Sequence, residues 1–187
     1  MSVCNFYGTI AYDCDDKKLA IGGAKLRVFV GNLSDLQTKI DFSDVSQDIT
    51  SLNFKAYKGL YEINTVRNGV EASDSATKEA NGAMRYTHQV ILKLLLENSL
   101  NRDIAERLLN ADDLFFIIER NSGRFEVFGG EAGLEATQET RNLGFTATGA
   151  DTSSTCTFVS EEESHLPRFF WDTDYSTTLA KLESYLV

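Results

Sequence analysis

Two short apolar runs joined by a three-residue loop constrain the fold of this chain most strongly. The runs are Leu114–Arg120 and Arg124–Phe128, and the loop between them is Asn121-Ser122-Gly123. A loop of this length, with a glycine that can take a positive φ, is a common connection between antiparallel strands. The glycines of the GGEAG stretch at 129–133 then bend the chain. The sequence therefore predicts an antiparallel hairpin here.

Apolar and polar residues alternate in several other runs of strand length. A period of two puts one face of a strand in the core and the other in water. In Tyr86–Leu96 both faces carry apolar side chains, which indicates a central strand. Pro167 marks Leu166–Asp172 as an edge strand, because proline donates no hydrogen bond to a neighbouring strand. The other predicted strands are Asn5–Tyr12, Ala24–Val30, Thr50–Ala56, Leu60–Val66, Leu134–Thr137, Asn142–Thr148 and Asp151–Val159.

The hydrophobic period lengthens to that of a helix at two places. Asn98–Asn110 carries apolar residues at i, i+4 and i+8, and Ser176–Val187 carries leucines at helical spacing. We therefore expect a mainly β protein: an antiparallel β sandwich or barrel with one packed helix and a C-terminal helix or arm. We expect residues 1–187 to form a single domain, with an arm or loop at 67–84 and a C-terminal extension at 173–187.

The chain is acidic, with a net charge of −10 over 187 residues. Gripping a phosphate backbone needs a dense Lys and Arg surface, so this charge argues against a protein that binds nucleic acid tightly. An acidic wall is compatible with enclosing DNA and letting the duplex slide, and acidity also simply keeps a protein soluble. We expect no membrane contact, because no run reaches the ~18 apolar residues of a membrane span.

No motif in the chain indicates catalysis, a cofactor or a metal. Cys4, Cys14 and Cys156 lack both the even count of a disulfide framework and the spacing of a zinc site. His88 and His165 have no nucleophile motif around them, which argues against a hydrolase. Three other stretches are interpreted as ordinary structural elements. GGEAG at 129–133 is expected to form a β bend rather than a phosphate loop. Glu161–Glu163 is expected to be a solvated loop, and DCDD at 13–16 a surface turn rather than a calcium site.

Residues 67–84 are the least core-like part of the chain, polar and rich in small side chains, with two Asn-Gly pairs. A loop this long inside a compact domain is usually functional or disordered. We expect an extended hairpin arm that becomes stable when a neighbouring subunit covers it. The candidate intersubunit residues of this stretch are Asn68, Gly69, Val70, Asn81, Gly82 and Met84.

The aromatic cluster Phe169-Phe170-Trp171 is the other candidate for contact between subunits. Large aromatic side chains dominate the energetics of cores and of interfaces alike. The sequence therefore leaves both roles open for these three residues.

The passage Tyr86–Thr148, about a third of the chain, runs through a strand, a helix, a strand, a hairpin and a Thr/Gly-rich strand. Its most distinctive part is RFEVFGGEAGLEAT at 124–137. This order of elements and this sequence motif resemble those of the tail tube proteins of tailed bacteriophages, whose hairpin follows the pattern (R/K)FxVFGxExGLExT. The stretches YGTIAY and TSLNFKAYKGLYEI nearer the N-terminus are compatible with the same family but less specific.

The resemblance implies a β sandwich with a packed helix, whose subunits form rings, commonly hexameric, with their sheets joined into a continuous barrel. Stacked rings make a conduit for DNA, and a long loop reaches the neighbouring ring. Residues 67–84 are the candidate for that loop. The candidates for further arms are Ser2–Gly8, which contains Phe6 and Tyr7, or the C-terminus. The implied protein is a structural part of the virion, made in the bacterial cytoplasm. Its partners are copies of itself, other tail or neck proteins, and double-stranded DNA that passes through without specific binding.

Two alternatives stay open. A longer N-terminal region and the tail Asp172–Val187 depart from the family pattern and leave open a terminator or connector ring of the neck or tail. A monomeric β-sandwich binding module, which uses its loops for a protein or carbohydrate ligand, fits the same fold class. Self-assembly separates these classes, because a binding module stays monomeric with or without residues 67–84.

Overall fold

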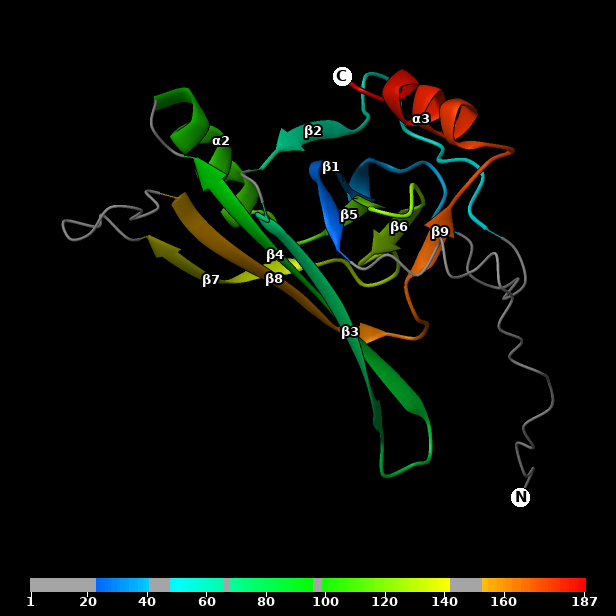
Figure 1. The fold of residues 1–187 in the computed structure, drawn as a ribbon. Coiled ribbons are helices and arrows are strands. Elements are labelled where there is room, and N and C mark those ends of the chain that lie inside the picture. Colours follow the sequence, from blue (N-terminus) through cyan, green and yellow to red (C-terminus); the bar gives the residue numbers. More distant parts are fainter. Residues whose placement is uncertain (1–22, 41–47, 66–67, 96–98, 142–152) are drawn as a thin grey trace.

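The computed structural model describes residues 23–40, 48–65, 68–95, 99–141 and 153–187, and two antiparallel sheets pack face to face within them (Figure 1). The five-strand sheet has the order β2-β1-β5-β6-β9, and the four-strand sheet has the order β3-β4-β8-β7. The predicted mainly β fold with the architecture of a sandwich is therefore confirmed. The predicted strands Asn5–Tyr12 and Asn142–Thr148, and with them Phe6 and Tyr7, lie outside the described residues.

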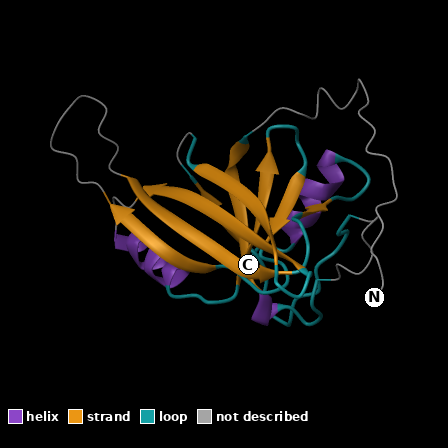
Figure 2. Cartoon of the chain, turned by 90° about the horizontal axis from the view of Figure 1, so that it is seen from below, coloured by secondary structure: helices purple, strands orange, loops and turns teal. Residues whose placement is uncertain are grey.

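The strands and helices have the following bounds. The five-strand sheet consists of β1 (Ala24–Asn32), β2 (Tyr61–Asn64), β5 (Leu114–Arg120), β6 (Phe125–Phe128) and β9 (Arg168–Phe170). The four-strand sheet consists of β3 (Val70–Lys78), β4 (Met84–Leu95), β7 (Glu135–Arg141) and β8 (Ser153–Glu163). The helices are the 3-10 turn η1 (Leu33–Asp35), α2 (Ser99–Leu109) and α3 (Tyr175–Ser184). Figure 2 shows the long strands side by side, with helices at their flanks.

The five-strand sheet is buried on both faces, and β5 shows why. Phe116 and Ile118 point to the four-strand sheet, while Phe115 and Ile117 point the other way, and all four are buried. An apolar run without alternation is typical of a strand covered on both faces. The sheet therefore separates two cores, which we call the first core, between the sheets, and the second core, on the far face.

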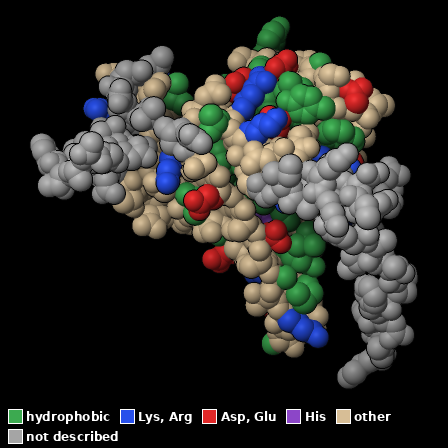
Figure 3. Space-filling model, viewed as in Figure 1, with side chains coloured by type: hydrophobic (Ala, Val, Ile, Leu, Met, Phe, Trp, Pro, Cys, Tyr) green, Lys and Arg blue, Asp and Glu red, His purple; other side chains and the backbone are tan. Residues whose placement is uncertain are grey.

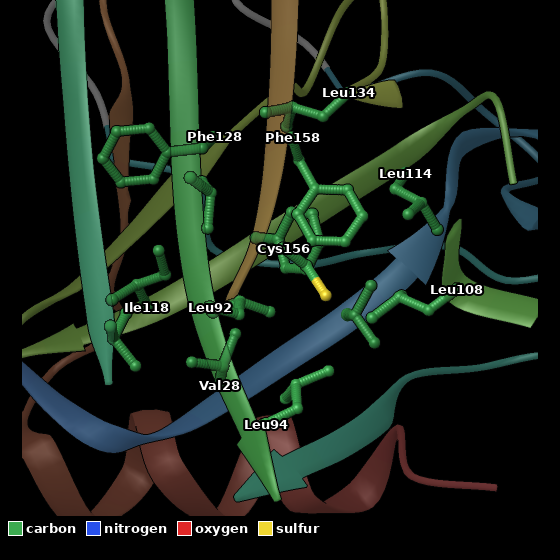
Figure 4. Packing of buried hydrophobic residues seen from close by; sticks show 14 of the residues in the cluster. Val28, Leu92, Leu94, Leu108, Leu114, Ile118, Phe128, Leu134, Cys156 and Phe158 are labelled. Carbon is green, nitrogen blue, oxygen red and sulfur yellow. The ribbon is translucent and has the colours of Figure 1, made fainter. Parts of the chain in front are cut away.

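The first core joins the two sheets. Figure 4 shows side chains from β1, β5 and β6 facing side chains from β4 and β8. Phe116 and Phe158 meet here with ring centroids 5.1 Å apart. Helix α2 closes one end of this core through Ala105 and Leu108, in agreement with the predicted packed helix.

The second core is closed by α3 and by the chain between η1 and β2. Leu182 of α3 is fully buried against this face, together with Phe29 and Leu60. The Asp174 side chain caps the helix by accepting a hydrogen bond from the Thr177 N–H. The C-terminal extension is therefore a helix packed on its own chain rather than a free arm.

Two local predictions are wrong. Thr50–Ala56 is not a strand, because it makes only an isolated bridge, between Leu36 and Phe54, and Leu52 anchors it on the second core as an irregular segment. Glu161–Glu163 is not a solvated loop, because β8 continues to Glu163, whose side chain is buried. The alternation of Thr50–Ala56 reflects burial of one face without a partner strand along its length.

Candidate functional site

The hairpin of β3 and β4 projects from the sandwich as an arm (Figure 1). The two strands pair over nine positions, from Val70 with Leu92 to Lys78 with Met84. Every residue of β3 after Val70 is exposed, because the far half of the hairpin has no sheet opposite it. The predicted arm at 67–84 thus corresponds to all of β3, the turn and the first residue of β4. We call the hairpin from Glu71 to Gln89 the arm.

The turn at the tip of the arm is hydrogen-bonded within itself. The Glu79 N–H donates to the Ala83 carbonyl over 2.8 Å, and the Gly82 N–H donates to the Glu79 carbonyl over 2.9 Å. The Asn81 side-chain carbonyl accepts the Ala83 N–H, and Gly82 takes φ +86. The second Asn-Gly pair therefore closes the tip of the arm with its own turn hydrogen bonds.

The two faces of the arm differ in character. Because successive residues of a strand alternate, the face that continues the first core carries two charged residues, Asp74 and Lys78, among the apolar side chains of Ala72, Ala76, Met84 and Tyr86. The opposite face carries Ser73, Ser75, Thr77, Arg85 and Thr87. Met84 is 45% exposed, and Figure 3 shows hydrophobic side chains along the projecting hairpin. The arm therefore presents a face of mixed character, the inner face of the arm, on which exposed Met84 stands beside Lys78, with nothing packed over its outer half among the described residues.

His88 lies at the root of the arm and fixes it to the loop after β6. The His88 ring is 3% exposed, and its Nδ1 accepts the Gly129 N–H over 3.1 Å. Its Nε2 lies 3.0 Å from the His165 carbonyl oxygen, so Nε2 carries the hydrogen and donates. Burial lowers the pKa of His88, against the attraction of the Glu163, Asp74 and Glu131 carboxylates. The ring is therefore neutral, and both nitrogens are engaged by backbone groups.

Glu131 and Glu163 hold the same loop from both sides. The buried Glu163 carboxylate accepts the backbone N–H groups of Glu131 and Ala132, each over 3.2 Å, and the Ser160 hydroxyl over 2.9 Å. The Glu131 carboxylate accepts the Ser164 N–H over 2.7 Å and lies 2.9 Å from His165 Nδ1. This reciprocal arrangement, which the sequence did not reveal, makes the GGEAG stretch a rigid structural bend rather than a ligand loop.

The aromatic cluster near β9 divides between core and surface. Phe170 is fully buried in the second core and stands opposite Phe125, so it does not meet another subunit. Phe169 and Trp171 are half-buried and face the other way, beneath the Arg124 guanidinium. Alternation along an edge strand thus assigns one of the three rings to the core and leaves two at the surface.

The other predicted contact residues fall at the two ends of the arm. Gly69 and Val70 are buried at its root, where the Gly69 carbonyl accepts the Lys93 N–H, so neither is a surface for a partner. Asn68 is exposed with φ 56. Asn81, Gly82 and Met84 lie at or beside the tip. The structure therefore brings the tip residues together and separates them from Phe169 and Trp171, which belong to the other sheet.

The four-strand sheet has an uncovered polar face and two edges without a partner strand. The side chains of β4 and β8 that point away from the first core are Thr87, Gln89, Ile91, Lys93, Thr155, Thr157 and Val159. Neither β3 nor β7 pairs with a further strand in the part of the chain that the structure describes. Strands at open edges are ready to pair with another chain.

The described residues contain no group of three or more His, Cys, Asp or Glu placed to hold a metal ion. None of the helices described is both long and apolar enough to cross a membrane. Comparison with protein-family models, with curated proteins and with solved structures found no match to this chain.

Proposed function

We propose that this protein is a structural subunit that assembles into stacked rings, hexameric by resemblance, of a bacteriophage tail tube. The single observation that carries this proposal is the arm: a hairpin closed by its own turn that extends past the body and leaves its inner face, with the exposed Met84, uncovered. Exposed apolar surface rimmed by polar residues marks sites of protein association. The proposed partner of the arm is a subunit of the neighbouring ring.

The four-strand sheet supports ring formation. Its open edges, β3 and β7, lie at opposite sides of one sheet, so identical subunits can continue the sheet from one copy to the next. Closing such a sheet into a barrel removes every exposed edge. The proposed lumen is lined by the uncovered face of this sheet, which is rich in threonine and carries few cations. Together with the net charge of −10, such a wall lets DNA pass without gripping it.

The proposal places the protein in the virion, in contact with copies of itself and with other tail or neck proteins. A terminator or connector ring of the neck is the nearest alternative, since it shares ring formation but not stacking. A monomeric binding module is the alternative of a different class. Each class predicts a different assembly state for the purified protein.

The test is mass photometry with negative-stain electron microscopy over a range of protein concentrations. A tube protein gives rings that stack, with a central hole about 2 nm across or wider, enough for a B-DNA duplex. Single rings that never stack indicate a terminator or connector, and a monomer at every concentration contradicts ring assembly.

A shortened arm gives the matched control. Residues 75–87 are replaced by Asn-Gly, which joins the paired residues Asp74 and His88 and keeps the buried ring in place. The expected result is a folded protein that forms single rings without stacks. Stacks of normal length from this variant would show that the arm does not join rings.

A further inference from the structure

The guanidinium of Arg124, at the end of the β5–β6 turn, lies over two aromatic rings. Its guanidinium carbon is 5.2 Å from the centroid of the Phe169 ring and 5.6 Å from that of Trp171. Arg120 lies 6.0 Å from the Phe169 ring on the same side. Stacking of this kind holds a guanidinium in place while its N–H groups remain free to bind a carboxylate. We call Arg124, Phe169 and Trp171 the arginine platform.

Arg124 lacks the carboxylate partner that neighbouring cations have. Arg120 pairs with Glu126 at 3.4 Å, Arg27 pairs with Glu62 and Glu183, and Lys25 pairs with Glu119. No ion pair of Arg124 exists in the described part of the chain. Arg124 is therefore held by its two rings without a counter-ion among the described residues, in a chain that carries 28 acidic and 18 basic residues.

The complementary surface lies on the other sheet. A hollow of about 400 Å³ beside β7 and the end of β8 has four acidic residues among its nine lining residues: Asp112, Glu135, Glu161 and Glu162. Glu162 is 3.7 Å from Arg85, but Asp112, Glu135 and Glu161 make no ion pair within the residues described. All of these carboxylates are exposed. We call this surface the acidic hollow.

We infer that the arginine platform of one copy docks in the acidic hollow of the next copy. This inference rests on the proposed ring and adds a side-chain contact at the β7 edge, beside the strand pairing proposed between β3 and β7. The arginine platform lies at β6 and β9 of the five-strand sheet, and the acidic hollow lies at β7 and β8 of the four-strand sheet (Figure 1). In the proposed contact, one copy therefore uses its platform and its neighbour uses its hollow. A head-to-tail contact of this type generates a ring when its rotation closes.

The chemistry of the two surfaces fits such a contact. A guanidinium fork binds carboxylates in a bidentate geometry, and the hollow offers several carboxylates within one concave surface. An exposed ion pair alone contributes little, but the aromatic rings beneath Arg124 exclude water once a partner covers them. The docking therefore combines a buried aromatic surface with charge complementarity, which also makes ring assembly weaken as the salt concentration rises.

The test is charge exchange, measured as the concentration at which half of the protein is in rings. Arg124→Glu and the hollow variant Glu135→Arg with Glu161→Arg are each expected to raise this concentration by about tenfold or more, the effect of losing one dominant contact residue. Combining all three changes restores assembly toward the wild-type value, because the charges again attract. Arg124→Met keeps an apolar side chain on the rings and isolates the charge. Arg107→Glu, on an exposed α2 arginine paired with Asp103, is the control and leaves assembly unchanged.

The outcomes separate this inference from the proposed function. If every variant forms rings at the same concentration as the wild type, the docking contact is wrong and the ring proposal stands. Disruption by the single-surface variants without restoration in the combination overturns the pairing of these two surfaces. A wild type that stays monomeric at every concentration overturns both. Circular dichroism and thermal unfolding of each variant exclude loss of fold as the cause.

Discussion

His88 and Gly129 are joined by a buried hydrogen bond, in which the Gly129 N–H donates to His88 Nδ1 over 3.1 Å. The bond links the root of the arm to the loop after β6, across 41 positions of sequence. It exists only while Nδ1 is unprotonated, because a protonated nitrogen has no lone pair to accept with. The anchoring of the arm is therefore tied to the charge of one histidine.

Acidification in the range just below neutral is expected to destabilise the fold. Burial lowers the pKa of His88 below its ordinary value of about 6.5, so the unfolded chain takes up this proton at a higher pH than the folded chain. Stability is therefore complete above about pH 6.5 and falls as the pH drops toward the folded-state pKa. Urea unfolding at a series of pH values from about 7.5 to about 5.5 measures how steeply the free energy of unfolding depends on pH.

The variant His88→Gln provides the control for this pH effect. Its starting stability is lower, but its unfolding midpoint is expected to lose most of the pH dependence in that window. The carboxylates with lowered pKa values, such as those of Asp35 and Glu62, change the stability only at more acidic pH. They therefore do not contribute to the pH dependence in this window. An unchanged slope in His88→Gln would show that another group carries the effect.

Replacing Gly129 by alanine is expected to lower the free energy of unfolding by about 3 kcal/mol, from overpacking and left-handed strain together. Gly129 has φ +72, and an added Cβ would lie 1.9 Å from Leu134 Cδ1 and 3.0 Å from the Leu114 carbonyl oxygen. Gly82→Ala is the matched control, since φ is +86 there but the space is open. It should cost only the strain, about 1 kcal/mol, in the same denaturation experiment.

Alanine at Phe170 is expected to cost about 3–5 kcal/mol of stability, as for other fully buried phenylalanines. Alanine at Phe169 removes a half-buried ring on the opposite face and should cost less than about 1.5 kcal/mol. Thermal unfolding of the two variants compares them directly. Equal losses would contradict the division of the cluster into a core ring and a surface ring.

Met84→Asp is expected to reduce stacking while leaving stability within about 0.5 kcal/mol, as for most surface substitutions. The added charge would lie on the inner face of the arm, which the proposed contact removes from water. Thr77→Asp puts the same charge on the polar face of the same hairpin and should stack normally. Stack length in electron micrographs distinguishes them, and similar stack lengths for both variants would rule out the inner face as the contact.

The parts of the fold that sequence patterns predicted are those set by neighbours along the chain. The β5–β6 hairpin follows from its apolar runs and the Asn121-Ser122-Gly123 loop, and α2 follows from the spacing of its apolar residues. The central position of β4, between β3 and β8, is as predicted, although its face with Thr87, Gln89, Ile91 and Lys93 is uncovered. Periodicity and turn chemistry act locally, so a single sequence contains them.

The parts that sequence patterns missed depend on residues far apart. Glu163 was expected in a solvated loop because three glutamates in a row usually are, yet distant backbone N–H groups stabilise its buried carboxylate. The stacking of Arg124 on Phe169 depends on β6 pairing with β9, which no local pattern specifies. In the same way, Thr50–Ala56 has the alternation of a strand but no strand beside it.

Because the five-strand sheet is buried on both faces, it cannot finish folding early during synthesis. The first core needs Cys156 and Phe158 opposite Val28, and the second core needs Phe170 and Leu182 opposite Phe29. Neither core can close on the ribosome until residues more than a hundred positions downstream of β1 have been made. Until then the apolar faces of β1 and β5 stay open to chaperones and to other nascent chains. Expression at lower temperature, or together with a chaperone, should therefore raise the yield of folded protein. A higher rate of translation should raise that yield less.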